Sequence, residues 1–196
     1  MLAAGAGIAY ADFSVTTSPP QSSFSAAASF CVSPGTQAAT DDADAWVNQG
    51  NVNQNNGSTS PLNVQPNSGQ NRRALIHFSL PALPHNCTVT SATLTVTVNS
   101  GTTGRTLNVF QAAATWVETT VTWANQPATT GSSSSAASAS SGNISWTVTS
   151  QVQAMYSGTN TGFIIKDSAE ASGSGNQKYN SREAASNKPQ LSITFG

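Results

Sequence analysis

Charge is what this sequence of 196 residues has least of. Only 8% of its residues are Asp, Glu, Lys or Arg, whereas an average soluble domain has roughly 25%. Seven basic and eight acidic residues give a net charge of -1, so we expect none of the basic patches to which nucleic acids bind. A surface of Ser, Thr, Asn and Gln gives little electrostatic repulsion between copies, which favours self-association.

Catalytic and membrane-spanning signatures are also missing. No motif pairs two carboxylates, or a nucleophile with a base, and neither His77 nor His85 has such a partner in the sequence. We therefore expect no enzyme, and no cofactor other than the candidate calcium ion described below. The apolar stretch of residues 1–11 is shorter than the ~20 residues that cross a bilayer, so we expect no membrane span.

Cysteine occurs only twice, as Cys31 and Cys87. These residues are too far apart in the sequence to form a metal-ligand pair. In an extracellular protein they would most simply form a disulfide. Closing a loop of some fifty residues in this way stabilises a fold by about 4 kcal/mol in the chain-entropy model. The alternative is two buried free thiols.

Two central strands are the clearest elements. Over residues 91–98, apolar side chains alternate with Ser and Thr, which is typical of a strand with one buried and one solvated face. Residues 73–80 are more continuously apolar, and Pro81 and Pro84 end that strand. Helical spacing over residues 149–156 predicts one short helix that ends at Gly158. Residues 129–142 have no apolar periodicity and predict a long surface loop.

Several motifs in register resemble the DNRLRE domain family. Residues 73–83 followed by residues 89–94 are similar to the family's core of a strand, a Leu-Pro turn and a second strand. Similar pieces follow in the family's order, at residues 116–118, 122–127, 146–153, 162–163, 179–184 and 189–193. The resemblance covers about residues 38–196 and implies an all-β, jelly-roll-like antiparallel β-sandwich of an extracellular protein. Some members are carbohydrate-binding modules with affinity for acidic polysaccharides such as alginate.

The first 37 residues form a separate apolar strand and connector in this interpretation. Residues 9–17 and 23–26 are similar to the start of the TasA and camelysin family of biofilm-fibre proteins. Alternation places apolar side chains on one face of this N-terminal extension strand, where they would enter the open sheet of a neighbouring subunit. The alternative is that the strand folds back into the sheet of its own chain. The candidate donor-strand residues are Leu2, Ile8, Ala9, Ala11, Phe13 and Val15.

Candidate ligand-binding residues fall into three groups. Glycan contacts are expected from Trp116, Trp123 and Trp146, with Arg72, Arg73 and Arg182 as candidates for an acidic glycan; the alternative for each Trp is core packing. Asp41, Asp42 and Asp44 offer carboxylates to Ca²⁺, or form a solvated turn. Sequons place candidate glycosylation at Asn56, Asn86 and Asn143.

Two functions compete on this basis. The first is a structural subunit of a secreted extracellular filament, a biofilm or pilus-like fibre. It would be a homopolymer of identical subunits that forms by donor-strand insertion. The second is a non-catalytic carbohydrate-binding module for an acidic polysaccharide. The apolar N-terminus and the low charge favour the first, while the family resemblance fixes the fold more firmly than the role.

Overall fold

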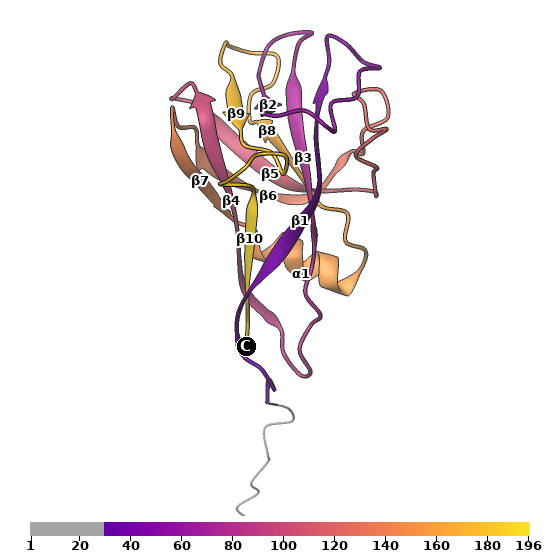
Figure 1. Cartoon of the computed structure of the whole chain (residues 1–196), viewed down its shortest axis with the longest axis vertical. Helices are drawn as coiled ribbons and strands as arrows, with labels where there is room; N and C mark the ends of the chain where they lie inside the picture. The colour runs from indigo at the N-terminus through magenta and orange to yellow at the C-terminus, as the bar shows by residue number, and fades with distance from the viewer. Residues whose placement is uncertain (1–29) are drawn as a thin grey trace, which may run out of the picture.

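The structure is a computed structural model that describes residues 30–196. The expected donor strand, with Leu2, Ile8, Ala9, Ala11, Phe13 and Val15, lies outside the described residues. Within them the elements are β1 (Gly35–Asn48), β2 (Leu62–Val64), β3 (Arg72–Ser79), β4 (Val89–Gly101), β5 (Thr106–Ala112), β6 (Thr129–Ala137), β7 (Gly142–Thr147), α1 (Thr149–Ser157), β8 (Phe163–Asp167), β9 (Gln177–Tyr179) and β10 (Gln190–Phe195) (Figure 1).

The strands form two antiparallel sheets that share β1. The first has the order β2-β9-β4-β10-β1, with β7 on the other side of β4, and the second has the order β1-β3-β8-β5-β6. Residues 35–39 of β1 pair with β10, and residues 40–48 pair with β3. The predicted all-β, jelly-roll-like sandwich with one short helix is confirmed. Its first strand begins at Gly35, within the stretch that was expected to be a connector.

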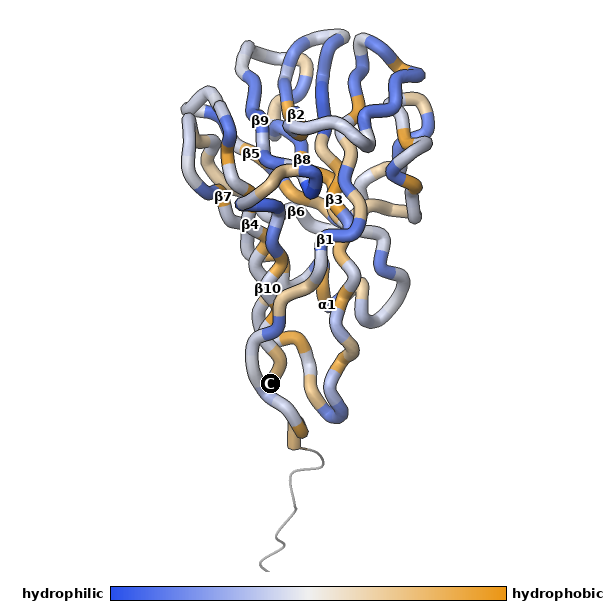
Figure 2. The backbone as a smooth tube through the Cα atoms, in the orientation of Figure 1, coloured by the Kyte–Doolittle hydropathy of each residue, from blue (hydrophilic) through white to orange (hydrophobic). Residues whose placement is uncertain are grey.

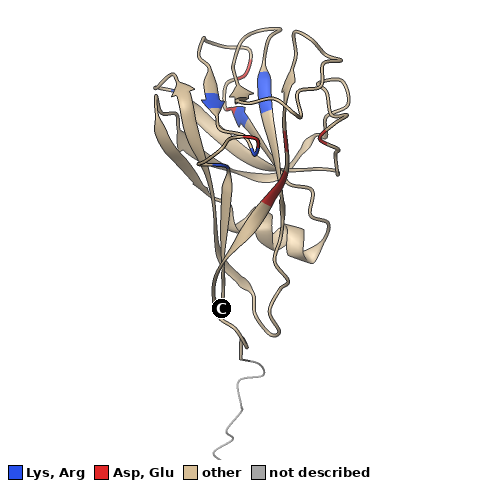
Figure 3. Cartoon of the chain, viewed as in Figure 1, with Lys and Arg blue, Asp and Glu red and all other residues tan. Residues whose placement is uncertain are grey.

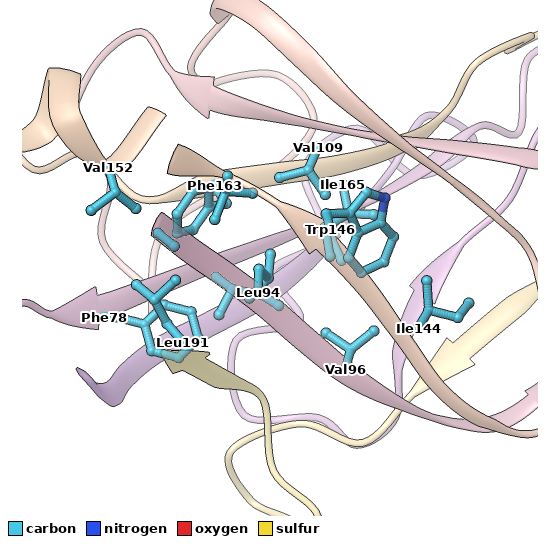
Figure 4. Close-up of a cluster of buried hydrophobic side chains, with 14 of the residues drawn as sticks. Phe78, Leu94, Val96, Val109, Ile144, Trp146, Val152, Phe163, Ile165 and Leu191 are labelled. Atoms are coloured by element: carbon cyan, nitrogen blue, oxygen red, sulfur yellow. The ribbon is translucent and has the colours of Figure 1, made fainter. Parts of the chain in front are cut away.

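A large apolar core fills the space between the sheets. On β4 the side chains of Ala92, Leu94, Val96 and Val98 are buried, as their alternation with Ser and Thr predicts. Figure 4 shows Leu94 and Val96 lying near Trp146 of β7 and Ile165 of β8 in this core. Figure 2 shows hydrophobic residues concentrated in the strands and hydrophilic residues in the loops at the upper end.

Trp146 belongs to this core and is not available to a glycan, so the alternative of core packing holds for this residue. Its side chain is only 1% exposed. The indole N–H donates a hydrogen bond to the carbonyl oxygen of Leu107 at 3.0 Å, which satisfies the one polar group of the ring inside the core. The alternation that places Ile144 and Trp146 on the same face of β7 is the physical reason for this burial.

A smaller apolar cluster lies on the other face of the second sheet. Ala45, Val47, Leu75 and Ile164 form its floor, and the segment of residues 112–123 covers it. Trp116 and Trp123 are half-buried in this cover. The covering segment runs past the edge of β1, so it brings residues near position 118 beside residues near position 44.

The prediction of a surface loop over residues 129–142 is wrong, because residues 129–137 form β6. This strand pairs with β5 at the edge of the second sheet, and most of its Ser, Thr and Ala side chains are exposed. A strand with both faces polar has no apolar period to read, and its stability comes from backbone hydrogen bonds to its neighbour. The helix is confirmed at residues 149–157, although its N-cap, Val148, makes no side-chain capping bond.

Charged residues gather in the upper half of the molecule. Figure 3 shows no charged residue at the narrow lower end of the described chain. This end is formed by the start of β1, by β10 and by the turn between β3 and β4. None of the described helices is long and apolar enough to cross a membrane.

The disulfide between Cys31 and Cys87 ties this lower end together, so the predicted pairing is confirmed. It joins the segment before β1 to the turn before β4, across 56 positions of sequence. Nearby, the Val32 N–H donates to the His85 carbonyl at 3.1 Å. We expect the Cys31→Ser, Cys87→Ser double variant to lose about 4 kcal/mol of unfolding free energy, because the unfolded chain regains loop entropy.

Chemical denaturation with and without reductant measures this loss. Reducing the unmodified protein should reproduce the destabilisation of the double variant and should not affect the variant itself. Equal midpoints for the oxidised and reduced protein would contradict the prediction.

Candidate functional site

The candidate site lies along the free edge of β1. From residue 40 onward this strand pairs only with β3, so its other edge needs hydrogen-bond partners. Loops from elsewhere in the chain supply them. The Asn56 amide donates to the Trp46 carbonyl at 3.0 Å, and the Asp44 N–H donates to Glu118 Oε1 at 3.0 Å. The edge is therefore closed by side chains instead of a further strand.

Glu118 is held firmly in this position. The Asn55 amide donates to the carbonyl oxygens of Glu118, at 2.8 Å, and Val121, at 2.7 Å. Gly57 packs so closely against the Glu118 backbone that a Cβ atom would have no room there. A loop rich in Asn and Gly thus fixes the segment that carries Glu118 against β1.

Three carboxylates meet at this edge. Asp44, Glu118 and Glu183 each offer an oxygen that lies within 4.8 Å of the others; we call these residues the acidic cluster. Arg182 is their cationic partner. Its guanidinium donates to both oxygens of Glu118, at 2.6 and 2.8 Å, its Nε lies 3.2 Å from Glu183 Oε1, and its backbone N–H donates to Asp44 Oδ2 at 2.6 Å.

Burial and mutual repulsion disfavour the ionised form of the carboxylates at this edge. Burial, followed by the charges of Glu183 and Glu118, raises the pKa of Asp44 to about 7, although the Arg182 N–H opposes the shift. Burial and the Asp44 charge raise the pKa of Asp41 to about 8. Asp44 Oδ1 and both oxygens of Asp41 are shielded from solvent and have no hydrogen-bond partner. Unpaired buried carboxylates are costly, so each calls for an explanation.

A cavity of about 400 Å³ opens beside the cluster. It is lined by Asp42, Ala43, His77 and the segment 115–119. Trp116 is half-buried there and its indole N–H donates to the Thr161 carbonyl at 3.1 Å, while Val117 is 60% exposed. A second cavity of about 220 Å³ shares residues 115–117, so this segment forms a ridge between two hollows.

Asp42 belongs to the cavity wall and not to the acidic cluster. Its carboxylate is bonded to His77 Nδ1 and accepts a hydrogen bond from the Ser79 hydroxyl, both at 2.5 Å. Burial alone would raise the pKa of Asp42, but these hydrogen bonds outweigh burial and lower it. Because the Ser79 hydroxyl is bonded to the carboxylate and not to His77, the three side chains do not have the geometry of an activated nucleophile.

The other candidate glycan-binding residues are mostly engaged within the fold. Arg73 pairs with Glu170 at 2.7 Å and lies over the Trp123 ring, 4.6 Å from its centroid. Arg72 lies over the Trp46 ring at 5.2 Å. The structure therefore brings Trp116 to the main cavity and leaves Trp123 and Arg72 away from it.

The candidate glycosylation sites differ in exposure. Asn86 and Asn143 are exposed, whereas Asn56 is 2% exposed and its amide nitrogen is occupied by the hydrogen bond to Trp46. Asn56 therefore has a structural role at the edge of β1.

One comparison with known proteins identifies the family. The model of carbohydrate-binding module family 96 matches residues 35–195. The chain belongs to this family. The match begins at the first residue of β1 and ends at the last residue of β10, so the family corresponds to the whole sandwich. No curated protein matches the chain.

Membership in family 96 agrees with the sequence-based expectation of a carbohydrate-binding β-sandwich over nearly the same residues. Modules of this kind are typically non-catalytic. The sequence alone missed the acidic cluster, because its members come from β1, from the cover segment and from the turn after β9. Only the match of residues 179–184 to a family motif signalled that Arg182 and Glu183 matter.

The Asn56 side chain provides a test of how the β1 edge is closed. We expect Asn56→Ala to cost about 1 to 3 kcal/mol of unfolding free energy, because the part-buried Trp46 carbonyl loses its donor. Asn51→Ala is the matched control, since the Asn51 amide donates to Gln54 at an exposed position; it should cost less than about 0.5 kcal/mol. Equal losses for the two variants in urea denaturation would contradict this role.

Proposed function

We propose that the protein is a non-catalytic module that binds a polysaccharide chain in the cavity beside Trp116. The observation that carries the proposal is the match to carbohydrate-binding module family 96 over the whole sandwich. The cavity has suitable chemistry, since Trp116 and Val117 offer apolar surface next to the polar groups of Asp42 and His77. Sugar rings present C–H faces and hydroxyl edges, and an aromatic ring with a few fixed polar groups matches both.

The ridge of residues 115–117 suits an extended ligand. Hollows lie on both sides of it, and the exposed Val117 lies between them. A polysaccharide that crosses the ridge would contact both hollows with successive residues. This arrangement favours the interior of a chain over a single small sugar.

The charges favour a neutral, hydroxyl-rich polysaccharide. Among the described residues, the main cavity is lined by Asp42 and Glu118 and by no Lys or Arg side chain, so it offers no such cationic partner to the carboxylates of an acidic chain. Arg182 is paired with Glu118, and Arg73 with Glu170. Two of the three arginines that were expected to bind an acidic polysaccharide are thus paired within the fold, while Arg72 lies over the Trp46 ring, away from the main cavity.

The two candidate functions, a carbohydrate-binding module and a filament subunit, differ in how far the findings support them. The cavity and the family match support carbohydrate binding, whereas no finding supports a polymer of identical subunits built by donor-strand insertion. The filament, like the likeness to the DNRLRE and TasA families, stays a prediction. The disulfide and the family together support an extracellular location, where disulfides persist and polysaccharides are accessible.

Affinity gel electrophoresis against neutral and acidic polysaccharides tests the proposal. We expect retardation by at least one neutral polysaccharide, and we expect Trp116→Ala to weaken binding at least about tenfold, since a buried aromatic anchor typically contributes 2 kcal/mol or more. Trp123→Ala is the matched control: Trp123 packs against the same small apolar cluster but does not line the main cavity.

The control separates loss of the site from loss of the fold. Both Trp variants should retain the circular dichroism spectrum of the parent and lose a similar amount of stability. If Trp123→Ala weakens binding as much as Trp116→Ala, the site lies elsewhere. Retardation only by acidic polysaccharides would contradict the proposed ligand class, and none by any polysaccharide would contradict the function.

A further inference from the structure

We propose that the acidic cluster of Asp44, Glu118 and Glu183 is a binding site for one calcium ion. The first observation is geometric. Oxygens from the three side chains lie within 4.8 Å of one another. Calcium binds oxygen at about 2.3 to 2.6 Å, so ligands on opposite sides of one ion are about 4.6 to 5.2 Å apart. The separations of the three oxygens are therefore within the range that a single calcium ion can span.

The second observation is an oxygen that lacks a partner. Asp44 is 0% exposed, and while its Oδ2 accepts the Arg182 N–H, its Oδ1 has no hydrogen-bond partner and no contact with solvent. A carboxylate oxygen buried in this way is strongly destabilising unless a cation or a donor reaches it. A cation bound at Asp44 would give this oxygen a partner.

The charge balance points to a cation of more than one charge. The three carboxylates of the cluster share one guanidinium, that of Arg182. A divalent ion would offset the two remaining negative charges, whereas a monovalent ion would leave one of them.

The donor set selects calcium among divalent ions. All three ligands are carboxylates, and neither His nor Cys belongs to the cluster; zinc and copper prefer nitrogen and sulfur. Glu183 is exposed, so water can complete the six to eight ligands that calcium takes. Magnesium keeps several of its waters and demands near-ideal octahedral geometry at about 2.0 to 2.1 Å, so it is less suited to three carboxylates that converge on one ion.

This site differs from the one that consecutive Asp residues predict. Of Asp41, Asp42 and Asp44, only Asp44 is a direct ligand; Asp42 is bonded to His77 and Ser79. A bound ion would join β1, the segment that carries Glu118 and the turn after β9, and so would hold one wall of the cavity in place. The inference rests on the cluster and not on carbohydrate binding.

Thermal unfolding of the full chain, after treatment with EDTA and dialysis, tests the site. Calcium chloride up to 10 mM should raise the midpoint, by about 5 to 10 °C at a hundredfold excess over Kd, and above Kd the rise should follow the logarithm of the calcium concentration. These calcium concentrations include the Kd values of extracellular calcium modules, which are roughly 10⁻⁴ to 10⁻³ M. Magnesium chloride at equal ionic strength should give a much smaller rise. Calorimetric titration should show one calcium ion per chain.

Matched variants locate the ion. Glu183→Gln removes an exposed ligand and is expected to fold; it should weaken calcium binding at least tenfold. Glu170→Gln removes a carboxylate that pairs with Arg73 outside the cluster, and it should retain the parent's calcium response. The proposal would be overturned if calcium does not stabilise the parent protein, or if magnesium stabilises it equally. It would also be overturned if Glu183→Gln keeps the same calcium response as Glu170→Gln. In that case the cluster is an ion pair closed by Arg182 alone.

Discussion

The passage of β1 from one sheet to the other is the constraint on which the rest of the structure depends. A single strand of 14 residues pairs first with β10 and then with β3. It therefore fixes how the two sheets face each other, but it leaves its own second half unpaired along one edge. Backbone groups at a partly buried edge must find donors and acceptors. Side chains of Asn56 and Glu118 meet that requirement.

Meeting this requirement with a carboxylate has electrostatic consequences. Glu118 accepts the Asp44 N–H and so comes to lie beside the Asp44 carboxylate. Arg182 is drawn to both, and Glu183 follows it along the chain. The same segment that positions Glu118 also carries Trp116 into the wall of the cavity. The acidic cluster and the cavity thus arise from one structural need, the closure of the β1 edge.

The strands and the helix were predictable wherever a face is buried. The alternation around Leu94 and Val96 revealed β4, and helical spacing around Val152 and Met155 revealed α1, because apolar periodicity reports directly on burial. β6 escaped prediction because most of its Ser, Thr and Ala side chains are exposed and only Ala136 packs against the core. The role of Trp146 was open from sequence, since a half-polar strand pattern does not tell which Trp faces the core.

The site was less predictable than the fold. Asp44 and Glu118 are 74 positions apart, and Asp44 and Arg182 are 138 positions apart. No local pattern encodes such contacts; they follow from the sheet topology and from the Asn- and Gly-rich loop that holds Glu118. The disulfide could be predicted because only two cysteines were present to pair.

The disulfide also determines how the module would respond to tension. Cys31 is linked covalently to Cys87, so a pulling force applied at Cys31 passes directly to the turn before β4. The residues between the two cysteines include all of β1, β2 and β3 and form a closed loop that such a force does not extend. Asp44 lies within this loop, whereas Glu118 and β10 lie outside it, so the load would act on the contacts that β1 makes with these later parts of the chain.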